Sequence, residues 1–188
     1  MAALAHSVKF TYEDYLLFPD DGRRHELIAG DRYVTPAPSR KHQIVVGNLH
    51  LLLQAHVKQE RMGRVYLSPF DVVLSEEDVV QPDLLYVSRE HAEHETDKGL
   101  SGAPDLVIEV LSEGSRRNDE VVKRKLYERV GVREYWIVDP VLETVKVFRS
   151  SPQGYQRVAE LSAEAADCLG SPLFPGWSAA LAAIFDLS

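Results

Sequence analysis

The stretch Asp105–Leu111 reads DLVIEVL, and the stretch Gly131–Pro140 reads GVREYWIVDP. Each contains a short and nearly continuous apolar run, which is typical of a strand buried on both faces. Between them, residues 115–130 have the apolar spacing of a helix, and Gly131 follows at the position where glycine often ends one. A strand, a helix and a second strand in this order form the centre of the predicted fold.

The elements on either side predict an α/β (α+β) fold, in which a mixed β-sheet is flanked by helices and preceded by an N-terminal β-hairpin. Helices 39–60 and 115–130 are the expected cover layers, because their apolar positions recur at helical spacing. The remaining expected elements are a hairpin over 25–35, strands at 65–67, 70–74 and 84–87, a loop or frayed helix over 91–102, a hairpin over 145–158 and a closing helix over 179–185.

Length and composition favour one globular domain spanning residues 1–188, with 45% hydrophobic and 27% charged residues. The single cysteine, Cys168, rules out a disulfide within the chain and suits a reducing compartment. The first fifteen residues lack a signal-peptide pattern, and no apolar run is long enough for a membrane span. We therefore expect a cytoplasmic protein. The net charge of −8 argues against a nonspecific nucleic-acid coat protein, but not against an enzyme with a local basic groove.

Glu109 is the anomaly of the first apolar strand. On a two-residue period it shares a face with Val107 and Leu111, where an isolated carboxylate is costly to bury. Asp83 lies in a similar position, at the beginning of the apolar run 84–87. Two acids that converge from different strands could hold magnesium or manganese. The alternative is that each acid forms a salt bridge with an arginine.

Asp119, Lys123 and Tyr127 follow at i, i+4 and i+8, so they share one face of the expected helix. The helix comes directly after the Glu109 strand, and its inward face can reach that strand's end. A lysine there could hold a water beside a metal ion and offset negative charge. The alternative is an ordinary ion pair on a solvated helix face.

Together these motifs resemble the Uma family of restriction endonucleases, a branch of the PD-(D/E)XK nuclease superfamily. The resemblance extends from about residue 11 to residue 187. It is carried by Gln81-Pro82-Asp83, by Ile108–Ser112, by Asp119-x-x-x-Lys123-x-x-x-Tyr127, by the GVREYWIVDP block, and by Arg24–Gly30, which is similar to the family's Tyr-Glu-Leu-Ile-Asp-Gly hairpin.

The resemblance implies a restriction-endonuclease-like core and magnesium-dependent cleavage of DNA phosphodiester bonds, with manganese as a substitute ion. Asp83, Glu109 and the backbone carbonyl of Val110 would be the metal ligands. Glu26 would be a further acid supplied by the N-terminal hairpin. The catalytic set would then be Glu26, Asp83, Glu109 and Lys123.

The chain departs from the family pattern at two positions. Leu111 stands where the superfamily motif has its lysine, and Lys123 fits the position to which the family moves that lysine. Glu113 stands where the family usually has proline. His42 matches a histidine that the family carries at the start of its first long helix, and together with Tyr127 it is an accessory candidate.

Arg116, Arg117 and Arg124 are candidates for contacts with DNA backbone phosphates, and a solvated helix face is the alternative for each of them. Cutting both strands of a duplex needs two active sites, which favours a homodimer, although no segment marks an interface. A different class of function is also open, namely a catalytically silent relative that keeps the fold as a binding or dimerisation module. A nuclease that acts on RNA is a third alternative.

Overall fold

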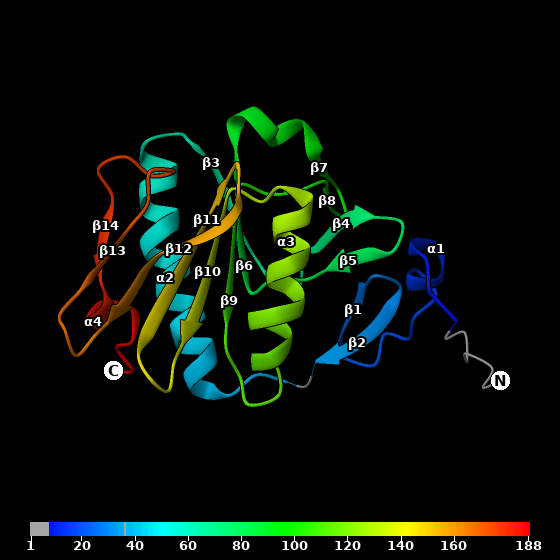
Figure 1. Cartoon of the computed structure of the whole chain (residues 1–188), viewed down its shortest axis with the longest axis horizontal. Coiled ribbons are helices and arrows are strands. Elements are labelled where there is room, and N and C mark those ends of the chain that lie inside the picture. The colour runs from blue at the N-terminus through cyan, green and yellow to red at the C-terminus, as the bar shows by residue number, and fades with distance from the viewer. Residues whose placement is uncertain (1–7, 36) are drawn as a thin grey trace.

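The computed structural model describes residues 8–35 and 37–188, so residues 1–7 of the stretch read for a signal peptide lie outside it. Its centre is a six-stranded sheet with the order β12-β11-β10-β9-β6-β3 (Figure 1). β9 and β10 are parallel, whereas the other neighbouring strands are antiparallel, which confirms the predicted mixed sheet. The strands are β3 (Gly63–Leu67), β6 (Leu84–Ser88), β9 (Leu106–Val110), β10 (Glu134–Asp139), β11 (Thr144–Ser151) and β12 (Gly154–Ser162).

The long helix α2 (Arg40–Gln59) covers one face of this sheet (Figure 1). Ser39 caps it, because its side-chain oxygen accepts a hydrogen bond from the His42 N–H. The buried side of α2 packs against Ile108 and Trp136 of the central strands, and its members are Val45, Leu49, Leu53 and Val57.

The opposite face of the sheet packs against α3 (Arg124–Val130) and against a second six-stranded sheet (Figure 1). The two sheets and α3 share one apolar cluster that includes Val107, Leu111 and Tyr127. Glu109 therefore lies between residues of this cluster, on the face that its sequence position predicts. The second sheet comprises β1 (Arg24–Ile28), β2 (Asp31–Thr35), β4 (Asp71–Ser75), β5 (Asp78–Val80), β7 (Glu95–Thr96) and β8 (Gly99–Ser101).

The helix predicted over residues 115–130 is confirmed over 116–130, but it is less regular than expected. Residues 116 and 117 are α-helical, a π-helix, η2 (Asn118–Lys123), comes next, and it continues directly into α3. Side chains stabilise the irregular turns: the Asp119 carbonyl accepts a hydrogen bond from the Tyr135 hydroxyl, and the Glu120 carbonyl accepts one from Arg124 Nε, both at 3.0 Å. Short π segments of this kind are frequent at functional sites.

Three other segments differ from the prediction. The expected loop over 91–102 contains a 3₁₀ helix, η1 (Arg89–His94), and the strands β7 and β8, and β5 has no counterpart in the prediction. β8 lies so close to β4 that a Cβ atom on Gly99 would be 2.2 Å from the Asp71 carbonyl oxygen. The expected closing helix is only α4 (Leu181–Ile184), preceded by β14 (Ser178–Ala180), which pairs with β13 (Cys168–Gly170). The element order begins with α1 (Tyr12–Tyr15), capped by Thr11.

Within residues 8–35 and 37–188, no helix combines the length and apolar character needed to cross a membrane.

Candidate active site

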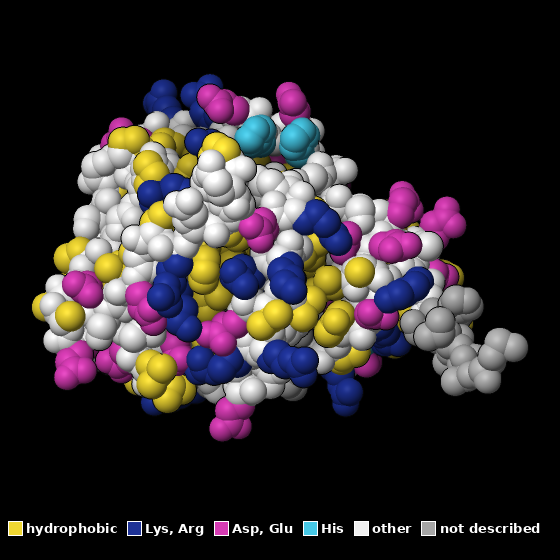
Figure 2. Space-filling view, in the orientation of Figure 1, with side chains coloured by type: hydrophobic (Ala, Val, Ile, Leu, Met, Phe, Trp, Pro, Cys, Tyr) yellow, Lys and Arg dark blue, Asp and Glu magenta, His cyan; other side chains and the backbone are white. Residues whose placement is uncertain are grey.

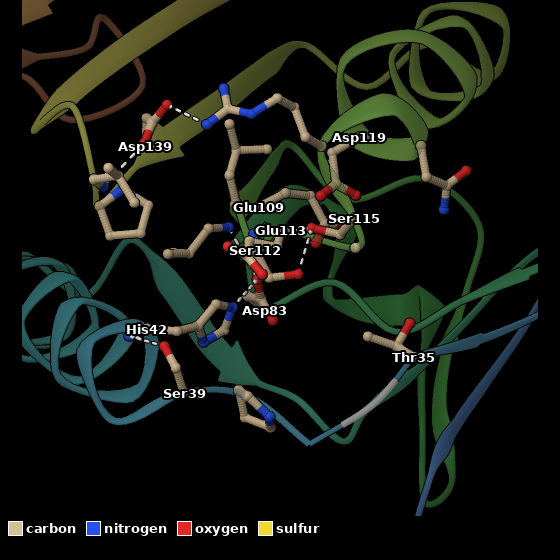
Figure 3. A pocket seen from close by; sticks show the side chains of 18 of the residues that line it. Thr35, Ser39, His42, Asp83, Glu109, Ser112, Glu113, Ser115, Asp119 and Asp139 are labelled. Atoms are coloured by element: carbon tan, nitrogen blue, oxygen red, sulfur yellow. Dashed lines mark hydrogen bonds and ion pairs between the residues drawn. The ribbon is translucent and has the colours of Figure 1, made fainter.

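Asp83 and Glu109 face each other across two neighbouring strands. Leu84 of β6 pairs with Ile108 of β9, so the next pair along the antiparallel ladder is Asp83 with Glu109. Side chains at opposing positions of an antiparallel pair lie on the same face of the sheet. The two acids are 4% and 2% exposed, and both line a pocket of about 890 Å³ (Figure 3).

Asp83 is held by three hydrogen-bond donors. Its Oδ2 accepts from His42 Nε2 at 3.1 Å and from the Val110 N–H at 2.9 Å. Its Oδ1 accepts from Arg24 Nη1 at 2.8 Å. Burial raises the pKa of Asp83, but the hydrogen bond from His42 and the charge of Arg24 outweigh burial and lower it to about 2. The carboxylate is therefore ionised at neutral pH.

Glu109 is held from the opposite side by Lys123 and Tyr127, whose Nζ and hydroxyl each donate to Glu109 Oε1 at 2.9 Å. The same Nζ donates to Glu26 Oε1 at 2.8 Å and lies 3.8 Å from Asp119 Oδ1. The predicted helix face thus reaches the end of the Glu109 strand, and three buried carboxylates share one ammonium group.

This sharing sets the charges of the cluster. Burial alone would lower the pKa of Lys123, but the charges of Glu109 and Glu26 outweigh burial and raise it above its usual value. Burial raises the pKa of Glu109, and the neighbouring carboxylates raise it further against the opposing charge of Lys123. The raised pKa of Lys123 and the raised pKa of Glu109 share a cause, which is that the buried carboxylates outnumber the ammonium group. The cluster can therefore accommodate additional positive charge.

The strand register places no backbone N–H opposite the Val110 carbonyl. The backbone N–H and C=O groups of Glu109 and Leu111 point towards β10. The N–H and C=O groups of Val110 therefore point towards β6. The residue opposite Val110 in that ladder is Pro82, which has no N–H to donate. Two opposed carboxylates and a free carbonyl are suitable ligands for Mg²⁺ or Mn²⁺. Among the described residues, no group of three or more His, Cys, Asp or Glu side chains is placed to hold a metal ion.

The other predicted residues occupy different positions around the pocket. His42 lines it, whereas Glu26 and Tyr127 are buried and contribute through their hydrogen bonds to Lys123 and Glu109. Arg116 lines the pocket and donates to Asp139 Oδ2 at 2.7 Å.

The remaining arginines and the two departures from the family pattern have separate positions. Arg117 is exposed and Arg124 lies over the Phe148 ring, and neither lines the pocket. Leu111 is a core residue, and the lysine that contacts Glu109 is Lys123. Glu113 is exposed on the pocket wall.

Two pocket residues escaped the sequence prediction. Arg24, which binds Asp83, stands two positions before Glu26 on β1, so the alternation of the strand could have placed both at the site. Asp139 organises the β10–β11 turn. Its Oδ1 accepts from the Val141 and Leu142 N–H groups, at 2.9 and 3.1 Å, and its Oδ2 holds Arg116. An aspartate followed by proline at a strand end is a common turn signal.

A mixed sheet flanked by helices, with opposed acids and a buried lysine at one end of it, defines a fold of restriction-endonuclease type. The chain belongs to the Uma2 family, described as "Putative restriction endonuclease", whose model matches residues 12–182. This confirms the resemblance seen in the sequence motifs.

A solved structure agrees with this fold. The crystal structure of a protein described as a "putative nuclease belonging to DUF820", from Anabaena variabilis ATCC 29413, superimposes with a TM-score of 0.79 and 22% identity, over 94% of this chain and 97% of that one. The type IIG restriction endonuclease BpuSI matches with a TM-score of 0.42 and 16% identity, over 69% of this chain and 15% of its own, which adds nothing to the comparison. No curated protein matches the sequence.

Proposed function

We propose that this chain is a nuclease that hydrolyses DNA phosphodiester bonds with Mg²⁺ or Mn²⁺. One observation carries the proposal: Asp83 and Glu109 oppose each other on the pocket wall, beside a carbonyl that Pro82 leaves free, and Lys123 contacts Glu109. Membership of a family described as restriction endonucleases supports the same chemistry.

Asp83, Glu109 and the Val110 carbonyl would hold the metal ion. When bound, such an ion polarises the scissile phosphate and lowers the pKa of a coordinated water. The Lys123 ammonium can donate a hydrogen bond to the attacking water and offset charge on the phosphate oxygens. Glu26 and Tyr127 are positioning residues, because they fix Lys123 and the Glu109 carboxylate through the hydrogen bonds described above.

Calorimetric titration of Mg²⁺ and Mn²⁺ tests the site, followed by incubation with supercoiled plasmid DNA. The variant Asp83→Asn should lose metal binding and cleavage. Glu134→Gln is the matched control, because Glu134 is an equally buried acid on the neighbouring strand β10, held by Arg149 and remote from the pocket. The Glu134→Gln variant should have a lower free energy of unfolding than the wild type, and its affinity for Mg²⁺ and Mn²⁺ should be unchanged.

One observation favours the catalytically silent module. Arg24 forms an ion pair with Asp83, and Lys123 forms one with Glu109, so each acid has a cationic partner within the chain. If the wild-type protein neither binds the metals with an oligonucleotide present nor cuts DNA or RNA, the silent module is the better account. If the protein cleaves RNA but not DNA, the proposed metal site is retained and the proposed substrate changes from DNA to RNA.

DNA as partner, a homodimer and a cytoplasmic location belong to the same proposal. Figure 2 shows Lys and Arg side chains gathered over α3 and the adjoining strands, although the chain as a whole carries a net charge of −8. This local charge suits the predicted phosphate contacts of Arg116, Arg117 and Arg124. Light scattering of the protein, alone and with duplex DNA, checks for a dimer.

A further inference from the structure

Arg24 places a positive charge where two pockets meet. It lines the catalytic pocket and also a second pocket of about 430 Å³, and Asp83 lines both of them as well. The Arg24 side chain is only 22% exposed, and its Nη1 lies 2.8 Å from Asp83 Oδ1. The guanidinium group is therefore directly beside the proposed metal site, with pocket space next to it.

The two oxygens of the Asp83 carboxylate differ in their partners. Oδ2 already accepts two hydrogen bonds, one from His42 Nε2 and one from the Val110 N–H. Figure 3 shows the His42 ring directed at Asp83. Oδ1 accepts one hydrogen bond, from Arg24 Nη1. Each carboxylate oxygen has two acceptor positions. Oδ1 is therefore the oxygen with room for a metal ion, and it is the one that Arg24 holds.

The charge of Asp83 is the main force that keeps Arg24 in this position. The same Nη1 also donates to Ser68 Oγ and to the Gln81 carbonyl, but both distances are 3.3 Å, which is long for a hydrogen bond. A divalent ion at Oδ1 would neutralise the Asp83 charge and repel the guanidinium group, since water screens charges poorly at a buried site. Arg24 and a metal ion are therefore expected to compete for Asp83.

The rest of the guanidinium group is available to another acceptor. Within the described part of the chain, Nε and Nη2 of Arg24 donate to no residue. Neither atom belongs to the fully buried polar atoms without a partner that occur among these residues, so both are accessible at the pocket surface. Arginine presents its N–H donors as a planar fork that matches the oxygens of a phosphate group.

We propose that Arg24 takes the place of the metal ion at Asp83 in the metal-free protein and moves to a phosphate oxygen of the DNA strand when a divalent ion binds. Arg24 keeps the buried Asp83 carboxylate paired until then, and afterwards it adds a second cation beside the scissile phosphate. The inference rests on the proposed nuclease function and deepens it, because it assigns a phosphate ligand to that site. It also gives a catalytic reason for the ion pair that favours the silent module.

The first measurement is the affinity for Mg²⁺ and Mn²⁺, by calorimetry without nucleic acid. The variant Arg24→Gln retains hydrogen-bond donors but removes the charge that competes at Asp83, so it should bind the metals about fivefold more tightly or better. Arg129→Gln is the matched control, because Arg129 pairs with the buried Asp78 at 2.7 Å and neither residue lines a pocket that contains Asp83. It should bind the metals like the wild type.

The second measurement repeats the titrations with a cleavage-resistant phosphorothioate oligodeoxynucleotide bound. In the wild type, a phosphate group that binds Arg24 draws it away from Asp83, so metal affinity should rise by about 5–150-fold, the usual range for coupling between two sites. Arg24→Gln lacks this contribution, and its metal affinity should rise by a smaller factor. An equal factor in both proteins would refute the contact between Arg24 and phosphate.

The outcomes separate this inference from the proposed function. If the wild type binds metal and Arg24→Gln binds it no more tightly, or if Arg129→Gln shows the same gain, the role of Arg24 is wrong and the nuclease proposal survives. Metal binding by Arg24→Gln alone would support the inference. If neither the wild type nor Arg24→Gln binds metal with the oligonucleotide present, the nuclease proposal fails, and this inference fails with it.

The wild type alone also tests the inference, in case Arg24→Gln does not fold. Nitrogen-15 NMR follows the guanidinium signals of Arg24, which depend on the acceptor that the group contacts. These signals should shift when Mg²⁺ is added and shift again when the oligonucleotide binds. Guanidinium signals that stay unchanged while the protein binds Mg²⁺ would refute the movement of Arg24.

Discussion

Replacing Lys123 by methionine removes the ammonium group that Glu26, Glu109 and Asp119 share and keeps an unbranched side chain. Lys123 is 4% exposed, and its Nζ lies 2.8 and 2.9 Å from the two glutamate oxygens. Removing one partner of a buried ion pair costs about 3–5 kcal/mol, because the remaining charge stays buried. A domain has only about 5–15 kcal/mol of total stability. At about 2–4 °C for each kcal/mol, the melting temperature should fall by roughly 6–20 °C.

Urea denaturation of the metal-free protein measures this loss. Lys146→Met is the matched control, because Lys146 Nζ lies at the same 2.8 Å from Glu120 Oε1, but both side chains are nearly 30% exposed. An exposed pair contributes about 0–1 kcal/mol. Adding Glu109→Gln to Lys123→Met should recover part of the loss, since one of the unpaired buried charges is then gone. Equal losses for Lys123→Met and Lys146→Met would refute the buried-charge reasoning.

Two further predictions concern the buried acids Asp105 and Asp139. Burial raises the pKa of Asp105, but hydrogen bonds from Ser88 and His91 lower it below its usual value. Its carboxylate therefore stabilises the fold above about pH 4, and this contribution is lost as the pH falls through the lowered pKa. The stability gap between wild type and Asp105→Asn, measured in urea, should narrow from pH 7 to pH 3, and a constant gap would contradict the assignment. Asp139→Ala should cost about 1–2 kcal/mol and accelerate hydrogen exchange at the Val141 and Leu142 amides; unchanged exchange there would show that Asp139 does not hold the turn.

The paired acids could be predicted from the sequence because each stands in or beside an apolar run. A carboxylate such as Glu109 in a buried strand needs a cation or donors, and that requirement is visible without a structure. Asp83 pairs with an arginine, Arg24, which is the alternative that the sequence offered to a metal ligand, whereas Glu109 pairs with a lysine, Lys123. The catalytic use of these residues stays a prediction.

Features that depend on contacts between distant segments could not be predicted in the same way. Arg24 and Asp83 are 59 positions apart, and their contact depends on how the hairpin docks on the central sheet. The π-helix also lacks a local signal, because its freed carbonyls are satisfied by Tyr135 from a later strand and by Arg124. β5 was not predicted because it begins at Asp78, in a stretch of acidic residues that is typical of an exposed turn. Asp78 is buried, and its carboxylate accepts hydrogen bonds from the Ala29 N–H and from Arg129, which lie far from it in the sequence.

The position of the lysine has a physical explanation in this fold. Leu111 and Glu109 lie on the same face of the strand, where a lysine at position 111 would also lie near the carboxylate. Position 111 is instead filled by a leucine that is 4% exposed, and its burial contributes about 2 kcal/mol. Lys123 can supply the ammonium because its helix follows the strand directly, so it packs over the same face. A lysine on the strand or on the helix could therefore contact the Glu109 carboxylate. With the lysine on the helix, position 111 of the strand can hold an apolar core residue.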